Sequence, residues 1–188
     1  MVTYRFPVWA AAALASVLSA GAAERPLVID AAQSRMEVVV KATVDSFNGK
    51  LAKYDAAVGV GDDGRVASAR LAFRFLDVLT GKDGRDKAMH KWQDTEKFSD
   101  GQFVLTSLEA APAPGTGLIA IGRLTFHGVV RELRFPVTVG REGDKYAIDG
   151  DATIDTREFG LPIIRMMGLL KVDPMVHVKF HLQGQVAR

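Results

Sequence analysis

The sequence predicts an all-β fold with one short helix, arranged as an eight-stranded antiparallel β-barrel. Apolar and polar residues alternate with a period of two in most of the predicted strands, so each of these has one apolar and one polar face. Short turns containing Gly and Asp join several successive segments, which favours antiparallel neighbours. Such strands bury their apolar faces in a two-sheet sandwich or in a closed barrel. We prefer the barrel, in which eight strands enclose a filled core or one small-ligand cavity.

The first four predicted strands are residues 36–44, 52–60, 67–75 and a shorter one at 103–108. In the first three, small and large apolar residues occupy one face and charged residues the other. The sequence Gly-Asp-Asp-Gly at 61–64 predicts the hairpin turn between the second and third strands. These strands therefore supply one half of the expected barrel.

The other four predicted strands are residues 118–126, 129–139, 146–154 and 176–182. The first of them is apolar on both faces, so its inner side cannot be assigned from the pattern. The remaining three alternate, and a turn at 142–144 separates two of them. Pro136 is expected on the outward face, where it could interrupt the ladder locally.

Two insertions interrupt the succession of strands. Residues 82–98 place Ala88, Met89 and Trp92 on one helical face, which predicts the short helix. Residues 157–172 carry a long apolar run instead. We expect both insertions to cover the mouth or the flank of the barrel.

The inward-facing positions predict a cavity, because many of them hold residues too small to fill a barrel. These are Ala42, Ala52, Ala56, Ala67, Ala69, Gly150 and Ala152. Large side chains expected to line such an apolar, ligand-binding space are Tyr54, Phe73, Phe75, Met89, Trp92, Tyr146, Met166, Met167 and Leu169. The alternative is that these same side chains pack together as an ordinary filled core.

Basic residues of the two insertions are candidates for contacting a ligand head group. We single out Arg85, His90, Arg157 and Arg165, since Arg can bind phosphate through two parallel hydrogen bonds. Acidic residues intersperse the first insertion, and Glu158 follows Arg157. A solvated mixed-charge surface is therefore the alternative for these positions.

No pattern of metal ligands or catalytic residues stands out. His177 and His181 lie four residues apart on a predicted strand, about 13 Å at 3.3 Å per residue, which is too far to share one ion. Both should point outward, and we predict no metal and no cofactor. The sequence has no G-x-S-x-G motif and no Cys, so we expect no catalytic residues. The enzyme alternative is a hydrolase of a lipid-like ester or amide with His90 or His127 as its base.

The composition is that of one globular domain. The chain has 188 residues, with 24 Lys and Arg against 22 Asp and Glu. A net charge of +2 does not supply the concentrated basic surface that binding of nucleic acid requires. We therefore predict one domain and no nucleic-acid partner, and the sequence is compatible with either a monomer or a homodimer.

Residues 1–23 predict a cleaved signal peptide. Arg5 precedes the apolar run 8–18, and the small residues 20–23 follow it. This run is shorter than the roughly 20 apolar residues that a bilayer requires, although an uncleaved anchor is the alternative. We expect cleavage after Ala22 or Ala23, leaving residues 24–188 as a periplasmic domain with no integral membrane segment.

Five stretches, taken in order, resemble the YceI-like family of secreted bacterial proteins. They are residues 29–34, the positions Gly81, Arg85-Asp86 and Lys97-Phe98 in the middle of the chain, and residues 122–129, 154–162 and 172–176. The resemblance implies a lipocalin-like barrel that binds polyisoprenoid or other amphiphilic lipids. We therefore expect a periplasmic protein that sequesters or carries such a lipid without chemistry. Its alternatives are the hydrolase and a stress-related interaction protein with a filled core.

Overall fold

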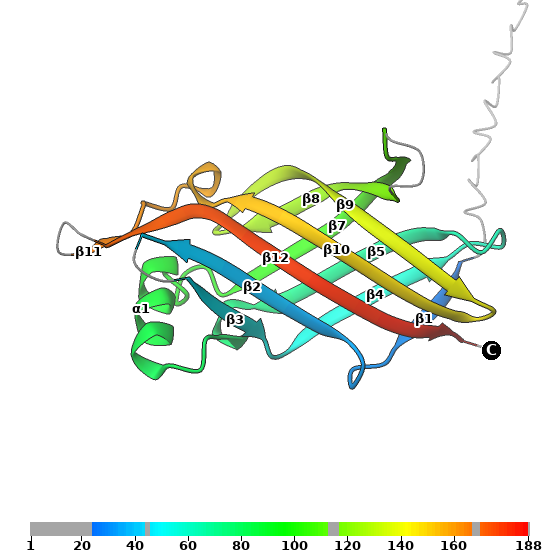
Figure 1. The fold of residues 1–188 in the computed structure, drawn as a ribbon, viewed down its shortest axis with the longest axis horizontal. Coiled ribbons are helices and arrows are strands. Elements are labelled where there is room, and N and C mark those ends of the chain that lie inside the picture. The colour runs from blue at the N-terminus through cyan, green and yellow to red at the C-terminus, as the bar shows by residue number, and fades with distance from the viewer. Residues whose placement is uncertain (1–23, 44–45, 113–116, 167–169, 188) are drawn as a thin grey trace, which may run out of the picture.

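The computed structural model describes residues 24–43, 46–112, 117–166 and 170–187, and its strands wind around one barrel with a helix at one end (Figure 1). The elements are β1 (Arg25–Ile29), β2 (Arg35–Ala42), β3 (Phe47–Leu51), β4 (Tyr54–Val60), β5 (Val66–Arg74), η1 (Phe75–Asp77), β6 (Val78–Leu79), α1 (Asp83–Gln93), β7 (Asp100–Ala110), β8 (Leu118–Phe126), β9 (Val129–Glu142), β10 (Lys145–Asp155), η2 (Thr156–Phe159), β11 (Arg165–Met166) and β12 (Leu170–Val186).

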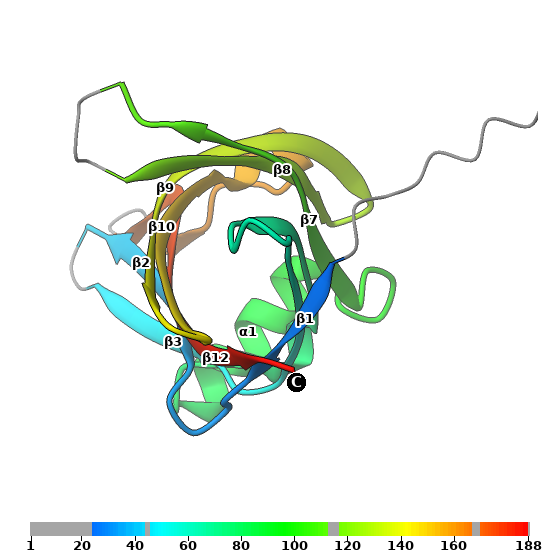
Figure 2. The same cartoon turned by 90° about the vertical axis from the view of Figure 1, so that its right-hand side faces the viewer.

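The barrel closes through antiparallel pairing of eight strands in the order β1-β4-β5-β7-β8-β9-β10-β12, with β1 pairing back to β12. The long strand β12 serves two neighbours on one edge: Val186 is opposite Leu27 of β1, and His177 is opposite Val39 of β2. Strands β3 and β6 continue the sheet beyond β2. Figure 2 looks along the barrel and shows the strands as a ring with α1 at the far end. The predicted all-β barrel with one short helix is confirmed.

Helix α1 forms where the first insertion was expected, and its ends follow simple rules. Asp83 and Asp86 occupy its first turn and His90 and Lys91 its last, as the helix dipole favours. Asp94 then adopts a left-handed conformation (φ 52°), and its N–H donates to the His90 carbonyl, which ends the helix. No helix among the described residues has the length and apolarity of a membrane span.

Two inward assignments from the sequence, Ala52 and Ala67, are wrong. The predicted strand 52–60 is broken, because β3 ends at Leu51 and β4 starts at Tyr54, and Ala52 lies exposed between them. In the β4–β5 pair the register shifts so that Ala67 has no partner between Val66 and Ser68. This bulge turns Ala67 outward while Ala69 still faces the interior.

The end of the barrel opposite α1 is closed by a packed core. Tyr146 is 2% exposed there, and its hydroxyl donates to the Gly64 carbonyl at 2.9 Å. Gly64 belongs to the predicted hairpin turn 61–64 and has a φ of +74°, a conformation that glycine adopts without strain. The cluster comprises Leu27, Val58, Val60, Tyr146, Ile148, Leu182 and Val186. This end is therefore closed to a ligand. The opposite end is the one that α1 covers.

Candidate functional site: an apolar cavity in the barrel

A cavity of about 850 Å³ extends from α1 into the barrel, as far as Val58, Ile148 and Leu182 of the closed-end core. Inward side chains of most strands line it, together with one face of α1 and residues 162–165. The wall is apolar apart from a few polar residues, namely Arg70, Arg85, His90, Gln93, Thr156, Arg165 and Asp173. All of these except Arg70 come from α1 or from the segments around it. The cavity thus has an apolar depth and a polar end.

The interior stays open partly because aromatic rings lie against glycines of neighbouring strands. A Cβ at Gly101 would collide with the ring of Phe73, and one at Gly150 would collide with that of Phe180. Each pair is directly opposite across its ladder. The rings can therefore lie along the wall instead of crossing the barrel. The described side chains leave the middle of the barrel unfilled, which argues against the filled-core alternative.

An aromatic cluster strengthens the wall near α1. Phe75 stacks on Phe126 with ring centroids 4.8 Å apart, and Phe126 is 5.1 Å from Phe159. Trp92 of α1 donates from Nε1 to the Pro162 carbonyl at 2.8 Å. This hydrogen bond ties the helix to the second insertion, so the two insertions form one rim at this end of the cavity.

The structure places four of the predicted lining residues, Phe73, Phe75, Met89 and Trp92, on the cavity wall. Tyr54 and Tyr146 lie elsewhere: Tyr54 packs between two core clusters, and Tyr146 belongs to the closed end. Burial raises the pKa of the Tyr54 hydroxyl. Both tyrosines are on an inward face, as expected. Tyr146 is removed from the open space by its depth in the closed end, whereas Tyr54, which is directly opposite Phe73, is occupied by packing against the two clusters.

The rest of the predicted lining residues fall in the second insertion. Met167 and Leu169 lie outside the described residues. Met166 belongs to β11, whose backbone pairs with that of Leu170 in β12.

Of the four head-group candidates, Arg85, His90 and Arg165 line the cavity. The Arg85 guanidinium lies over the Phe47 ring, 4.3 Å from its centroid. This contact places a positive charge at the α1 end.

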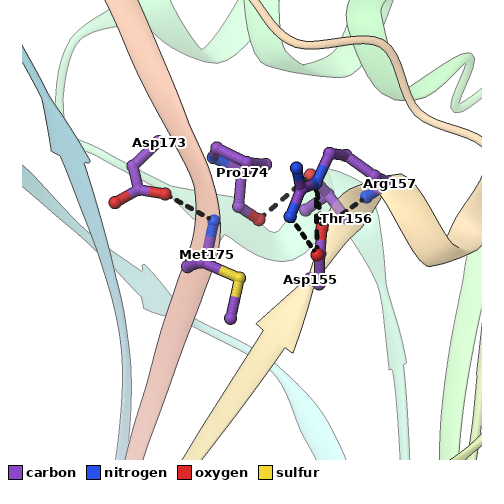
Figure 3. Close-up of polar contacts among 6 residues, drawn as sticks. All are labelled: Asp155, Thr156, Arg157, Asp173, Pro174 and Met175. Carbon is purple, nitrogen blue, oxygen red and sulfur yellow. Dashed lines mark hydrogen bonds and ion pairs between the residues drawn. The ribbon is translucent and has the colours of Figure 1, made fainter.

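Arg157, the fourth candidate, is exposed and forms no part of the described wall. Its guanidinium pairs with Asp155 through Nε to Oδ1 at 2.9 Å and Nη2 to Oδ2 at 2.6 Å (Figure 3). These hydrogen bonds lower the pKa of the Asp155 carboxyl and raise that of Arg157. Arg157 thus lies on an exposed mixed-charge surface, the alternative given for this position, and its partner there is Asp155.

The same region fixes η2 against β12. Thr156 donates from its hydroxyl to the Pro174 carbonyl at 3.2 Å, and the Met175 N–H donates to Asp173 at 2.9 Å (Figure 3). Thr156 and Asp173 both line the cavity. Their polar groups are thus already engaged, at least in part, by the protein.

Gln93 is one of the wall residues that sequence reasoning missed. Its side chain is 2% exposed, and neither its amide nitrogen nor its amide oxygen has a hydrogen-bond partner among the described residues. The Nε2 atom of His90 is buried and unpartnered in the same way. Gln93 lies four residues after Met89 on α1, so the helical period that placed Met89 inward could also have found it.

The remaining histidines lie outside the cavity wall. His181 Nδ1 is 2.8 Å from Asp149 on the outer face, and His177 Nδ1 is 3.4 Å from Asp151. The apolar residues between them, Val178 and Phe180, face the cavity, so the outward prediction for both histidines holds. Within the described ranges, no three potential metal-ligating side chains come together.

His127, the other histidine outside the wall, bonds through Nδ1 to the Phe159 carbonyl at 2.9 Å.

A family model for the YceI-like domain matches residues 27–184, which includes nearly every described strand. The chain belongs to the YceI-like family. The match confirms the resemblance inferred from the five sequence stretches. No curated protein sequence matches this YceI-like chain.

Solved structures share the YceI-like barrel. BcnA of Burkholderia cenocepacia has a TM-score of 0.71 and 23% identity, and the match covers 84% of this chain and 99% of that one. A polyisoprenoid binding domain from Saccharophagus degradans, implicated in plant cell wall breakdown, has a TM-score of 0.64 and 18% identity, with 88% and 100% covered. The YceI protein of Campylobacter jejuni has a TM-score of 0.63 and 15% identity, with 78% and 88% covered. At these identities the likeness supports the fold.

Proposed function

We propose that this YceI-like protein binds an amphiphilic lipid with a long apolar chain, of the isoprenoid class, and holds or carries it in the periplasm without chemistry. The observation that carries the proposal is the cavity of about 850 Å³, closed by a packed core at one end and apolar along its depth. That volume lies in the range of small-molecule sites, about 300–1,000 Å³. The apolar chain would point toward Ile148 and Leu182, and the polar head toward α1.

The energetics favour a long chain over a compact polar ligand. Each methylene moved from water into such a wall contributes about 0.8 kcal/mol, so ten or more supply ample affinity. The depth of the cavity offers few polar groups to satisfy a hydrophilic ligand. The polyisoprenoid binding domain from Saccharophagus degradans, which has the same fold, supports the isoprenoid class.

The disposition of the polar residues supports binding without chemistry. Of the two histidines considered as bases for a hydrolase, His90 lines the cavity, whereas His127 is hydrogen-bonded to the Phe159 carbonyl away from it. The described wall has one hydroxyl group, that of Thr156, and it donates to Pro174. His90 therefore has no free hydroxyl to activate among the described wall residues.

The ligand is tested by native mass spectrometry of the protein expressed with its own signal peptide in a Gram-negative host. We expect a one-to-one complex whose extra mass, after extraction, is that of an isoprenoid lipid. Delipidated protein should then rebind farnesol, a prenyl alcohol, with an increase in melting temperature. Empty protein that binds neither farnesol nor a plain prenyl hydrocarbon would overturn the proposal, and turnover of a prenyl ester would favour the hydrolase.

Export to the periplasm is the second part of the proposal, and it rests on residues 1–23, which lie outside the described residues. The order of Arg5, the apolar run 8–18 and the small residues 20–23 supports a cleaved signal peptide. We expect the intact mass of protein from a periplasmic extract to correspond to a chain that starts at Ala23 or Glu24. A full-length mass recovered only from membranes would mean an uncleaved anchor.

A further inference from the structure

Two residues of helix α1 on the cavity wall carry three buried polar atoms that have no partner among the described residues. They are the amide nitrogen and oxygen of Gln93 and the Nε2 atom of His90. Both residues line the cavity, and they lie three positions apart on one face of the helix. Buried polar groups are nearly always hydrogen-bonded, because an unmade bond leaves the cost of desolvation uncompensated. These atoms therefore indicate a polar partner inside the cavity.

A structural role does not explain Gln93. Its side chain is 2% exposed, yet it makes no hydrogen bond to the helix, the strands or the second insertion as far as these are described. Its neighbours Met89 and Trp92 show that the same helix face can carry apolar residues packed in the core clusters. Packing alone would be served equally well by Leu or Met at position 93.

We propose that Gln93 and His90 form a hydrogen-bonding subsite for a neutral hydroxyl group carried by the apolar ligand, an assignment that rests on the proposed function. A hydroxyl donates one hydrogen bond and accepts others, which matches an amide that offers both a donor and an acceptor. A phosphate offers only acceptors, so it leaves the Gln93 oxygen, itself an acceptor, without a donor; the charge of such a group would instead be met by Arg85 and Arg165 on the same wall. The Gln93 amide therefore matches an alcohol-type head, whereas an anionic head would depend on the two arginines.

The subsite also sets the direction in which the ligand lies. Gln93 and His90 are on α1, whereas Val58, Ile148 and Leu182 mark the opposite, apolar end of the cavity. A hydroxyl held at α1 leaves the chain to extend along the barrel toward this apolar end. The polar end and the apolar depth would thus select amphiphiles over plain hydrocarbons.

The test compares three uncharged probes on delipidated protein, with farnesyl phosphate as a charged fourth. Farnesol can donate and accept hydrogen bonds, farnesyl methyl ether can only accept them, and farnesene can neither donate nor accept them. Wild-type protein should bind the three uncharged probes in that order, and Gln93→Leu should weaken the binding of farnesol more than that of farnesyl phosphate. Gln93→Leu should lower the affinity for farnesol about tenfold and change the affinity for farnesene little, as expected for loss of hydrogen bonds to one group. The ratio of wild-type to variant affinity for each probe cancels the different hydrophobicity of the probes.

Two further variants keep the result interpretable. Gln93→Met preserves side-chain length and serves if Gln93→Leu folds poorly. Met89→Leu, on the same helix face, should affect all three probes alike. If the Gln93 variants also affect all probes alike, or weaken the binding of farnesyl phosphate as much as that of farnesol, the subsite is refuted while the lipid-binding function stands. If no probe binds wild-type protein, both proposals fail.

Discussion

Replacement of Phe159 by Ala is expected to lower the free energy of unfolding by about 3 to 5 kcal/mol, the usual cost of truncating a packed aromatic residue. Phe159 is 2% exposed and belongs to a core cluster with Leu124, Phe126 and Leu161. Its ring centroid is 5.1 Å from that of Phe126. Because Phe159 is not among the wall residues of the cavity, its removal creates new empty space in packed protein. Urea unfolding monitored by circular dichroism measures the loss.

Phe73→Ala is the matched comparison, since Phe73 is also an aromatic residue in a core cluster but lies on the cavity wall. One side of its ring already faces open space, so empty Phe73→Ala protein should lose less stability than Phe159→Ala protein. Its affinity for farnesol should fall, because the ring is part of the apolar wall. An equal loss of stability in the two variants, with no farnesol binding by wild-type or Phe73→Ala protein, would mean a filled core and no ligand cavity.

Ala152→Phe is expected to block the ligand. Ala152 is 5% exposed and lines the cavity next to Phe135 and Val137, so a phenyl ring there projects into the open space. Excluding about four methylenes of a prenyl chain, at about 0.8 kcal/mol each, weakens binding by about two orders of magnitude. Isothermal titration with farnesol, or the shift in melting temperature on its addition, measures this effect.

The control is Thr153→Phe, one residue further along β10 on the exposed outer face, which should leave farnesol affinity unchanged. Overpacking around Ala152 can itself cost stability, typically about 1 to 3 kcal/mol. Ala56→Phe, at a half-buried position on the same wall, provides a second blocking variant. Wild-type affinity in both folded blocking variants would place the ligand outside the barrel.

Period-two alternation and turn residues predicted most of the strands, because both depend on local backbone geometry. They missed the short strands β3 and β6 and also β1, which closes the barrel in place of the predicted strand 36–44, now β2. The hairpin at 61–64, the helix in 82–98 and the outward direction of His177 and His181 all follow from patterns within a few residues. Five dispersed stretches then indicated the YceI-like family, which the family match over residues 27–184 confirms. Small inward residues also pointed to an unfilled interior.

Local pattern fails where the chain departs from regular geometry. Ala52 falls in a break between β3 and β4, and Ala67 is the extra residue of a bulge, so both lie outside although the alternation places them inside. A single unpaired residue reverses which face a side chain takes. Such breaks depend on how two strands pair across the sheet, which the alternation of either strand alone does not encode.

The sequence by itself determined most of the long strands, most of their apolar faces and the family that the chain resembles. Only the tertiary structure decided the depth of each side chain along the barrel, which separates Phe73 on the cavity wall from Tyr146 in the closed end. It also decided the partners of polar groups, pairing Arg157 with Asp155 and leaving Gln93 unpartnered inside the cavity. The depth of a side chain and its hydrogen-bond partners depend on contacts between segments far apart in the chain. Strand formation and the side of the sheet on which a side chain lies depend mainly on the residues within each segment.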